Sequence, residues 1–117
     1  MDSRSPYLHC RLIAYADSIS FYREVKAIRA RMPRGLGPLA DQLSRAAQSV
    51  SLNLAEGAAA RSRDVKRRHF EVALGSASEC AAALDLLEIE QAAPADLLAR
   101  ARDDLRRATL RTLGLMR

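Results

Sequence analysis

The sequence predicts an all-α fold, an up-down-up-down antiparallel four-helix bundle that forms one domain over residues 1–117. Three observations support this prediction. Apolar residues recur at three- and four-residue steps in four segments, which is the spacing of one helix face. No segment shows the apolar–polar alternation of a strand, and β-branched and aromatic residues are scarce. The turns between the segments are short, so consecutive helices are expected to be antiparallel neighbours.

The first helix is predicted over residues 8–31, after a polar arm at residues 1–7. Its apolar side chains follow helical spacing: Leu12, Tyr15, Ile19, Tyr22, Val25 and Ile28. Pro33 disfavours a helical conformation at the residue before it, so this helix is expected to end near Arg31.

The second helix is predicted over residues 38–58, after a turn marked by two prolines and two glycines. Pro38 suits the first helical position because its fixed φ matches a helix. The expected core stripe is Leu39, Leu43, Ala46, Ala47, Val50 and Leu54. Gly57 either ends this helix or lies inside it, with the following alanines carrying the helix another turn.

The third helix is predicted over residues 63–91, with Ser62 as its N-cap and Asp64 near the positive end of its dipole. Its expected core residues are Phe70, Ala73, Leu74, Ala77, Cys80, Ala81, Leu84 and Leu87. Gly75 lies in the middle of this helix, where it costs about 1 kcal/mol relative to Ala. Such a glycine indicates that a neighbouring backbone approaches closely.

The fourth helix is predicted over residues 94–115, beginning at Pro94 after a break in the apolar pattern. Its inward side chains are Leu97, Leu98, Ala101, Leu105, Ala108, Thr112 and Leu115. The outer face is rich in arginine, and Asp103 and Asp104 offset part of that charge.

The chain carries a net charge of +5, which permits binding to nucleic acid or to an anionic surface. Cys10 and Cys80 lie in apolar helical patterns and form no CxxC motif, so both are expected to be reduced core thiols. Reduced thiols agree with a cytoplasmic location. Neither a secretory signal nor a membrane-spanning segment is expected.

Three motifs resemble the 23S rRNA-intervening-sequence family: QLSRAAQSVSLNLAEG at residues 42–57, Arg61-Ser62, and RHFEVALGSASE at residues 68–79. The chain departs from the family pattern at Ser51, Val65 and His69. The resemblance implies a four-helix bundle that assembles into a homo-oligomeric ring, with a pentamer known among relatives. It also extends to accessory variability proteins of diversity-generating retroelements, which associate with RNA and a reverse transcriptase. RNA or a nucleic-acid enzyme is therefore an expected partner.

Five basic residues between the second and third helices form the predicted nucleic-acid surface: Arg61, Arg63, Lys66, Arg67 and Arg68. We call this set the basic cluster. Repeated around a ring, it could contact several phosphates at once, and binding would then be non-specific and salt-dependent. The alternative is a solvated basic face that binds nothing.

Two further sets of residues are candidates for contacts between helices or between subunits. A polar network is predicted if the second and third helices pack through Gly57 and Gly75; its members are Asn53, Glu56, Arg68 and Glu79. The network either fixes helix register or forms a polar site at a subunit junction. A second apolar stripe predicts an oligomer interface, made of Leu52, Val72, Ala83 and Leu86. The alternative is scattered surface apolar residues.

The residues therefore predict a non-enzymatic oligomeric bundle, with RNA association through the basic cluster as one role and protein–protein adaptor as the alternative. No catalytic residue, cofactor or metal ligand is predicted. Glu56 and Glu79 lack the Glu-x-x-His companions of di-iron bundles, so an enzyme at these carboxylates is the least favoured reading.

Overall fold

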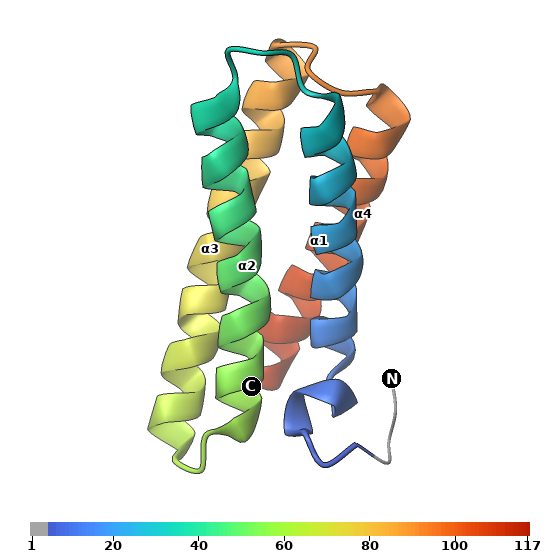
Figure 1. Cartoon of the computed structure of the whole chain (residues 1–117). Helices are drawn as coiled ribbons and strands as arrows, with labels where there is room; N and C mark the ends of the chain where they lie inside the picture. The colour runs from blue at the N-terminus through green and yellow to red at the C-terminus, as the bar shows by residue number, and fades with distance from the viewer. Residues whose placement is uncertain (1–4) are drawn as a thin grey trace.

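The computed structural model describes residues 5–117, apart from the side chain of Cys10. This part of the chain folds into a 3₁₀ helix and four α-helices, without a strand (Figure 1). The bounds are η1 Leu8–Arg11, α1 Ile13–Arg31, α2 Gly37–Ala59, α3 Arg63–Ile89 and α4 Ala95–Leu115. The predicted all-α class and the four helices are confirmed. Among the described helices, none is long and apolar enough to cross a membrane.

The four α-helices run up and down in sequence order, and α4 returns to lie beside α1 (Figure 1). Each helix contacts the one before it and the one after it, and α1 contacts α4. The turns between α1 and α2 and between α3 and α4 lie at one end of the bundle (Figure 1). The α2–α3 turn and the end of α4 lie toward the other end.

The first predicted helix is divided in two. The predicted range of residues 8–31 is wrong at its start, because Leu12 is extended (φ −89°, ψ 124°) and separates η1 from α1. The break lets η1 fold back against α2, which a continuous helix in line with α1 would not do. The other end is as predicted, since Met32 before Pro33 is extended and α1 ends at Arg31.

Local capping explains the other helix ends. Ser62 caps α3 as predicted, because its Oγ accepts a hydrogen bond from the backbone N–H of Val65 at 3.3 Å. The opposite end of α3 comes two residues earlier than predicted, at Ile89. There Gln91 adopts a left-handed φ of 52°, and the N–H of Ala92 bonds the carbonyl of Leu87 at 3.0 Å. This pattern is a Schellman-type cap with glutamine in the position that glycine usually fills.

The core is built from all four α-helices. Its largest fully buried side chains are Phe21, Val25, Ile28, Leu43, Leu54, Leu84 and Leu87. The thiol of Cys80 is also buried, and burial, reinforced by Glu79, raises its pKa to about 12. Cys80 is therefore the core thiol that its pattern predicts.

The core face of α1 is rotated from the prediction. Tyr15, Ile19 and Tyr22 are only partly buried, whereas Phe21 and Ser18 are fully buried. Ser18 is accommodated because its Oγ donates to the carbonyl of Tyr15 at 2.7 Å and accepts from Ser51 Oγ at 2.9 Å. Because the hydroxyls of Ser18 and Ser51 are hydrogen-bonded to each other, both polar side chains can be buried at this position.

Charged side chains join α1 to α4. Arg111 of α4 donates to Asp17 of α1 at 2.6 Å, and within α4 Arg107 pairs with Asp104. The Oε2 atom of Glu24 is buried and receives no donor in the described part of the chain. Burial, together with the hydrogen bond and negative charge of Asp104, raises the pKa of Glu24 to about 7. A hydrogen bond between these two carboxyls requires one of them to carry a proton.

Candidate nucleic-acid interface

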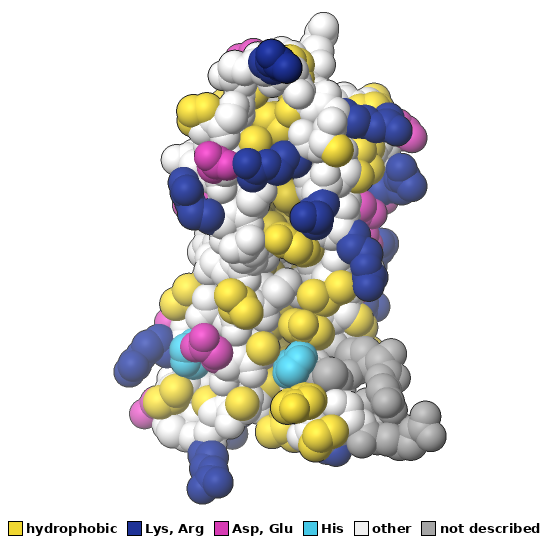
Figure 2. All heavy atoms as spheres, viewed as in Figure 1, with side chains coloured by type: hydrophobic (Ala, Val, Ile, Leu, Met, Phe, Trp, Pro, Cys, Tyr) yellow, Lys and Arg dark blue, Asp and Glu magenta, His cyan; other side chains and the backbone are white. Residues whose placement is uncertain are grey.

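The basic cluster lies at the end of the bundle where α2 turns into α3 (Figure 1). Figure 2 shows the long face of the molecule, where basic side chains are spread singly among hydrophobic ones. Arg61, Arg63 and Arg68 are exposed, and no hydrogen bond or ion pair joins them to another residue of the range 5–117. These three guanidiniums are the members of the basic cluster that are both exposed and without a partner in this range.

Lys66 is held in place by the end of α2. Its Nζ donates to the carbonyls of Gly57 at 2.7 Å and Ala58 at 3.2 Å, which belong to the last turn of α2, where carbonyls lack the usual intrahelical partner four residues on. The same ammonium lies 5.9 Å from the centre of the Phe70 ring. Lys66 therefore stabilises the α2–α3 corner, and its charge stays fixed near the surface.

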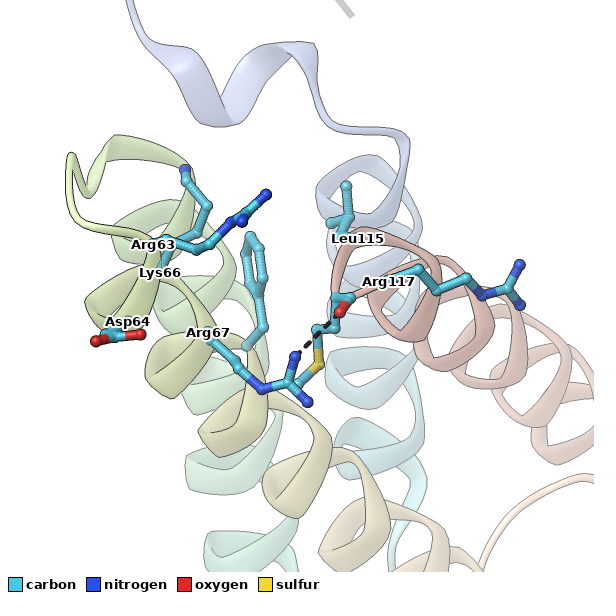
Figure 3. A pocket seen from close by; sticks show the side chains of 8 residues that line it. Arg63, Asp64, Lys66, Arg67, Leu115 and Arg117 are labelled. Atoms are coloured by element: carbon cyan, nitrogen blue, oxygen red, sulfur yellow. Dashed lines mark hydrogen bonds between the residues drawn. The ribbon is translucent and has the colours of Figure 1, made fainter.

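Two hydrogen bonds, from two different nitrogens of its guanidinium, fix the orientation of Arg67. Its Nε donates to Glu71 at 3.3 Å, one turn along α3. Its Nη1 donates to the carbonyl of Met116 at 3.1 Å, which connects the start of α3 to the end of α4 (Figure 3). The side chain of Arg67 is therefore oriented before any ligand arrives.

A cavity of about 550 Å³ lies between the start of α3 and the end of α4 (Figure 3). We call it the α3–α4 cavity. Four cationic side chains and one carboxylate line it, together with three apolar side chains. The lining residues are Arg63, Asp64, Lys66, Arg67, Phe70, Leu115, Met116 and Arg117. Three members of the basic cluster line the cavity, and two, Arg61 and Arg68, do not.

The sequence pattern missed the α4 side of this cavity. Arg67 and Met116 are 49 positions apart, so a search for neighbouring basic residues cannot join them. The expected antiparallel order of α3 and α4 was the available signal, because it places the start of one helix beside the end of the other.

The polar network forms only in part. Asn53 and Glu56 both meet His69, whose Nδ1 lies 3.1 Å from Asn53 Oδ1 and 3.3 Å from Glu56 Oε2. Neither Arg68 nor Glu79 makes a hydrogen bond or ion pair with another residue in the range 5–117. The four-residue network therefore does not form within one chain. The sequence marks His69 only as a departure from the family pattern, and that pattern gives no sign that His69 joins the two helices.

The spacing of polar residues along α2 and α3 could have identified His69 as a contact between the two helices. Ser49 and Asn53 are one turn apart on α2, while His69 and Ser76 are two turns apart on α3. Ser76 Oγ donates to Ser49 Oγ at 2.7 Å, so the same two helix faces meet at both levels. These contacts fix how α2 and α3 align along their length.

The two glycines of α2 and α3 have different surroundings. A Cβ built on Gly57 would lie 2.5 Å from Cε1 of Phe70, so the ring packs directly on the α2 backbone. A Cβ on Gly75 would meet no atom within 4 Å. The prediction that α2 and α3 pack through Gly75 is therefore wrong, because this glycine is on the surface of the chain.

Three of the four predicted interface residues are exposed. The exposed fractions of Leu52, Val72 and Leu86 are 61%, 46% and 52%. Ala83 corrects the prediction: it is 6% exposed and packs in the core of its own chain, so it is not available to a second copy. Leu52, Val72 and Leu86 are called the exposed leucine–valine set below.

No group of three or more His, Cys, Asp or Glu side chains within the described range lies close enough to hold a metal ion.

Comparison with protein families gives one match. The family model described as 23S rRNA-intervening sequence protein matches residues 11–109. This range includes the basic cluster and the contacts of His69, and it stops before Leu115, Met116 and Arg117, which complete the cavity. No curated protein matches the chain.

Proposed function

Since the chain belongs to the 23S rRNA-intervening sequence protein family, we propose that it is a non-enzymatic, ring-forming helical bundle that associates with RNA in the cytoplasm. The observation that carries the RNA association is the basic end of the bundle, where the α2–α3 turn presents several exposed guanidiniums. The partner is RNA itself, alone or together with an enzyme that acts on RNA.

The chemistry of the basic end favours phosphate over a specific base. Arg61, Arg63 and Arg68 are exposed and project from a short turn and one helix. Exposed guanidiniums bind phosphate oxygens through charge-assisted hydrogen bonds. Ring symmetry would repeat the same three groups in each subunit, so several weak contacts would act on one RNA. Binding would then be strong at low salt and would fall steeply as salt rises.

The exposed leucine–valine set supports self-association. These side chains lie on α2 and α3, where each exposes about half of its surface or more. Gly75 lies in the middle of the same α3, and a Cβ at this position would meet no atom of the described chain within 4 Å. An interior glycine costs a helix about 1 kcal/mol relative to Ala. Close approach by a second copy gives this glycine a structural reason, and repeated heterologous contacts of that kind form a ring when the rotation between subunits closes.

The polar contacts between α2 and α3 support a structural role for this pair. Ser49, Asn53, His69 and Ser76 hydrogen-bond to one another across the two helices. Because these polar groups satisfy one another's hydrogen bonds only in one alignment of the two helices, they fix the register of α2 against α3.

RNA association is tested by titrating the protein into fluorescently labelled single-stranded RNA at about 50 and 300 mM salt. Arg61→Glu/Arg68→Glu reverses charge at the basic end, and Arg31→Glu/Arg34→Glu makes the same change at the other end. We expect the first variant to lose about tenfold or more in affinity and the second to lose little.

Equal losses would mean that overall charge, and not this end, attracts the RNA. If the unmodified protein binds no RNA at low salt, the RNA role is wrong. The exposed leucine–valine set would then favour the protein–protein adaptor.

Self-association is tested by light scattering on Leu52→Arg and Leu86→Arg, with Leu113→Arg on α4 as the control. Leu113 is also exposed, at 44%, but lies on a different helix. We expect the first two variants to have a lower mass than the control. A monomeric unmodified protein would exclude the ring, and an unchanged mass for both variants would place the interface on another face.

A further inference from the structure

We propose that the α3–α4 cavity is a nucleotide-binding site in which Arg63 and Arg67 hold the phosphate and the apolar wall of α4 contacts the nucleoside. The inference rests on the proposed RNA association and deepens it, because it assigns one nucleotide of the RNA to a defined place. A free nucleotide offers the same chemistry, and the experiment separates the two sources.

Charge in the cavity favours an anion. Arg63, Lys66, Arg67 and Arg117 line it, against the carboxylate of Asp64 in the lining and that of Glu71, which pairs with Arg67 from outside the lining. In Figure 3, Asp64 points outward on the far side of α3, whereas Arg63 and Arg67 lie at the two sides of the cavity. Arg117 extends away from the cavity in the same view, so it adds charge without lining the centre. The two guanidiniums of α3 are therefore the groups that a phosphate would meet.

Arg67 is prepared for this role. Its bonds to Glu71 and to the Met116 carbonyl use Nε and one hydrogen of Nη1, and its other N–H groups are unused within the described chain. Because the guanidinium is already oriented, binding a phosphate would cost little further side-chain entropy. Arg63 makes no bond within residues 5–117 and is free to close on the ligand.

The size and the apolar wall fit a nucleotide better than a bare anion. The volume of about 550 Å³ falls within the range of small-molecule sites, roughly 300–1,000 Å³. Leu115, 41% exposed, and Met116 offer aliphatic surface to a ribose and base. Phe70 is only 3% exposed, so its ring is not a free stacking platform. Binding should consequently show little preference among bases.

The cavity differs from a diffuse basic surface because α4 contributes to it. Leu115 and Met116 come from the end of the chain, and the Arg67–Met116 hydrogen bond joins them to the basic cluster. A surface that attracted RNA by charge alone would not require these residues. Variants that keep the charge and change the shape therefore separate the two arrangements.

The first experiment compares two double variants with the same loss of charge. Arg63→Gln/Arg67→Gln alters the cavity, and Arg61→Gln/Arg68→Gln alters the neighbouring surface outside it. Binding of AMP is followed by NMR titration, and binding of labelled oligouridine by anisotropy. We expect the cavity variant to lose about tenfold or more for both ligands, and the control about two- to threefold for the oligonucleotide only.

The second experiment keeps the charge. Leu115→Trp places a larger side chain at the cavity wall, and we expect it to remove AMP binding while oligouridine retains its salt-dependent attraction to the basic end. Because Arg67 also ties α3 to α4, thermal unfolding of every variant is measured, and Arg63→Gln alone is tested as a variant that breaks no described bond.

The outcomes distinguish this inference from the proposed function. Equal losses in the two double variants, or no AMP binding by the unmodified protein, overturn the cavity site and leave RNA association in place. AMP binding that depends on Arg63 and Leu115, without any binding of oligouridine, overturns the RNA role and leaves a free-nucleotide site. Loss of both AMP and oligouridine binding in Arg63→Gln/Arg67→Gln, together with loss of AMP binding alone in Leu115→Trp, supports both.

Discussion

The α2–α3 interface and the α1–α4 interface join neighbouring antiparallel helices by different means (Figure 1). Between α2 and α3, a phenyl ring packs on a glycine and hydroxyl and amide groups bond one another. Between α1 and α4, a guanidinium bonds a carboxylate, and two further carboxyls lie together. Both interfaces also share the apolar core, but the contacts that distinguish them are close packing and neutral hydrogen bonds in the first and charged groups in the second.

This difference predicts which perturbation each interface resists. Packing at native density tolerates little added volume, so the α2–α3 interface should be most sensitive to an added methyl group. Charged pairs change with protonation and with screening by salt, so the α1–α4 interface should be most sensitive to pH and ionic strength. The variants below test these assignments, from the largest expected effect to the smallest.

Gly57→Ala should have the largest effect. The new Cβ would lie 2.5 Å from Cε1 of Phe70, and this ring is buried and has little room to move. Overpacking of this kind costs about 1–3 kcal/mol, and we expect the upper part of that range. Urea unfolding measures the loss.

Gly114→Ala is the matched control for Gly57→Ala, because a Cβ at Gly114 meets nothing within 4 Å. We expect it to leave the free energy of unfolding unchanged or slightly raised by helix propensity. If Gly57→Ala proved as harmless as this control, the α2–α3 interface would not depend on shape.

Glu24→Gln should have the next largest effect, and its sign depends on pH. Burial first, and then Asp104, raises the pKa of Glu24 from 4.5 to about 7. Between these two values the folded chain holds a proton that the unfolded chain has released, so the free energy of unfolding falls as pH rises. Below pH 4.5 both states are protonated, and above pH 7 the full penalty of burying the charge remains.

Glu24→Gln removes this penalty, and its amide can still donate to Asp104. We expect the variant to be more stable than the unmodified protein by about 1 kcal/mol near pH 8, after screening by solvent and arginines reduces the full shift. Near pH 4 the two should be alike. Glu79→Gln, at an exposed and unpaired position within the described range, is the control. Parallel pH profiles for Glu24→Gln and the unmodified protein would contradict the α1–α4 assignment.

The fold could be predicted from the sequence because its signals are local. Pro38 in the first turn of α2, the Ser62 cap and the apolar spacing set the helices without knowledge of their neighbours. The face of α1 could not be predicted in the same way. Large side chains at Tyr15 and Tyr22 outweigh Ser18 in the pattern, yet Ser18 is buried because Ser51 on another helix bonds it.

In the candidate site, too, some features follow from local sequence and others depend on how the helices pack. The members of the basic cluster all lie between Arg61 and Arg68, so the local density of basic residues in the sequence locates the cluster. The cavity beside it and the contacts of His69 depend on which residues of two helices lie at the same height, and this register is set by packing. Gly75 is the clearest case in which the sequence is insufficient. A glycine in the middle of a helix predicts a close backbone contact, but a Cβ at Gly75 would meet no atom of the described chain within 4 Å.

Ser76→Ala tests a neutral bond of the α2–α3 interface. Ser76 Oγ donates to Ser49 Oγ at 2.7 Å, and the variant leaves Ser49 without this partner. We expect a loss of about 1 kcal/mol, the usual value for a partly buried neutral hydrogen bond. Ser78→Ala, on the same helix at an exposed position, is the control in the same unfolding experiment.

Arg111→Gln should have the smallest effect and gives the sharpest contrast with Ser76→Ala. Arg111 bonds Asp17 at 2.6 Å; about half of the Arg111 side chain is exposed, whereas Asp17 is mostly buried and still lies near Arg107, so we expect a loss of about 0.5–1 kcal/mol. Because salt screens exposed charges, this loss should shrink between about 0.05 and 0.5 M NaCl. The loss caused by Ser76→Ala should stay constant over the same range, since both partners are neutral. Arg106→Gln, an exposed neighbour on α4, corrects for the change in net charge. If the two losses depended equally on salt, charge would not distinguish the α1–α4 interface from the α2–α3 interface.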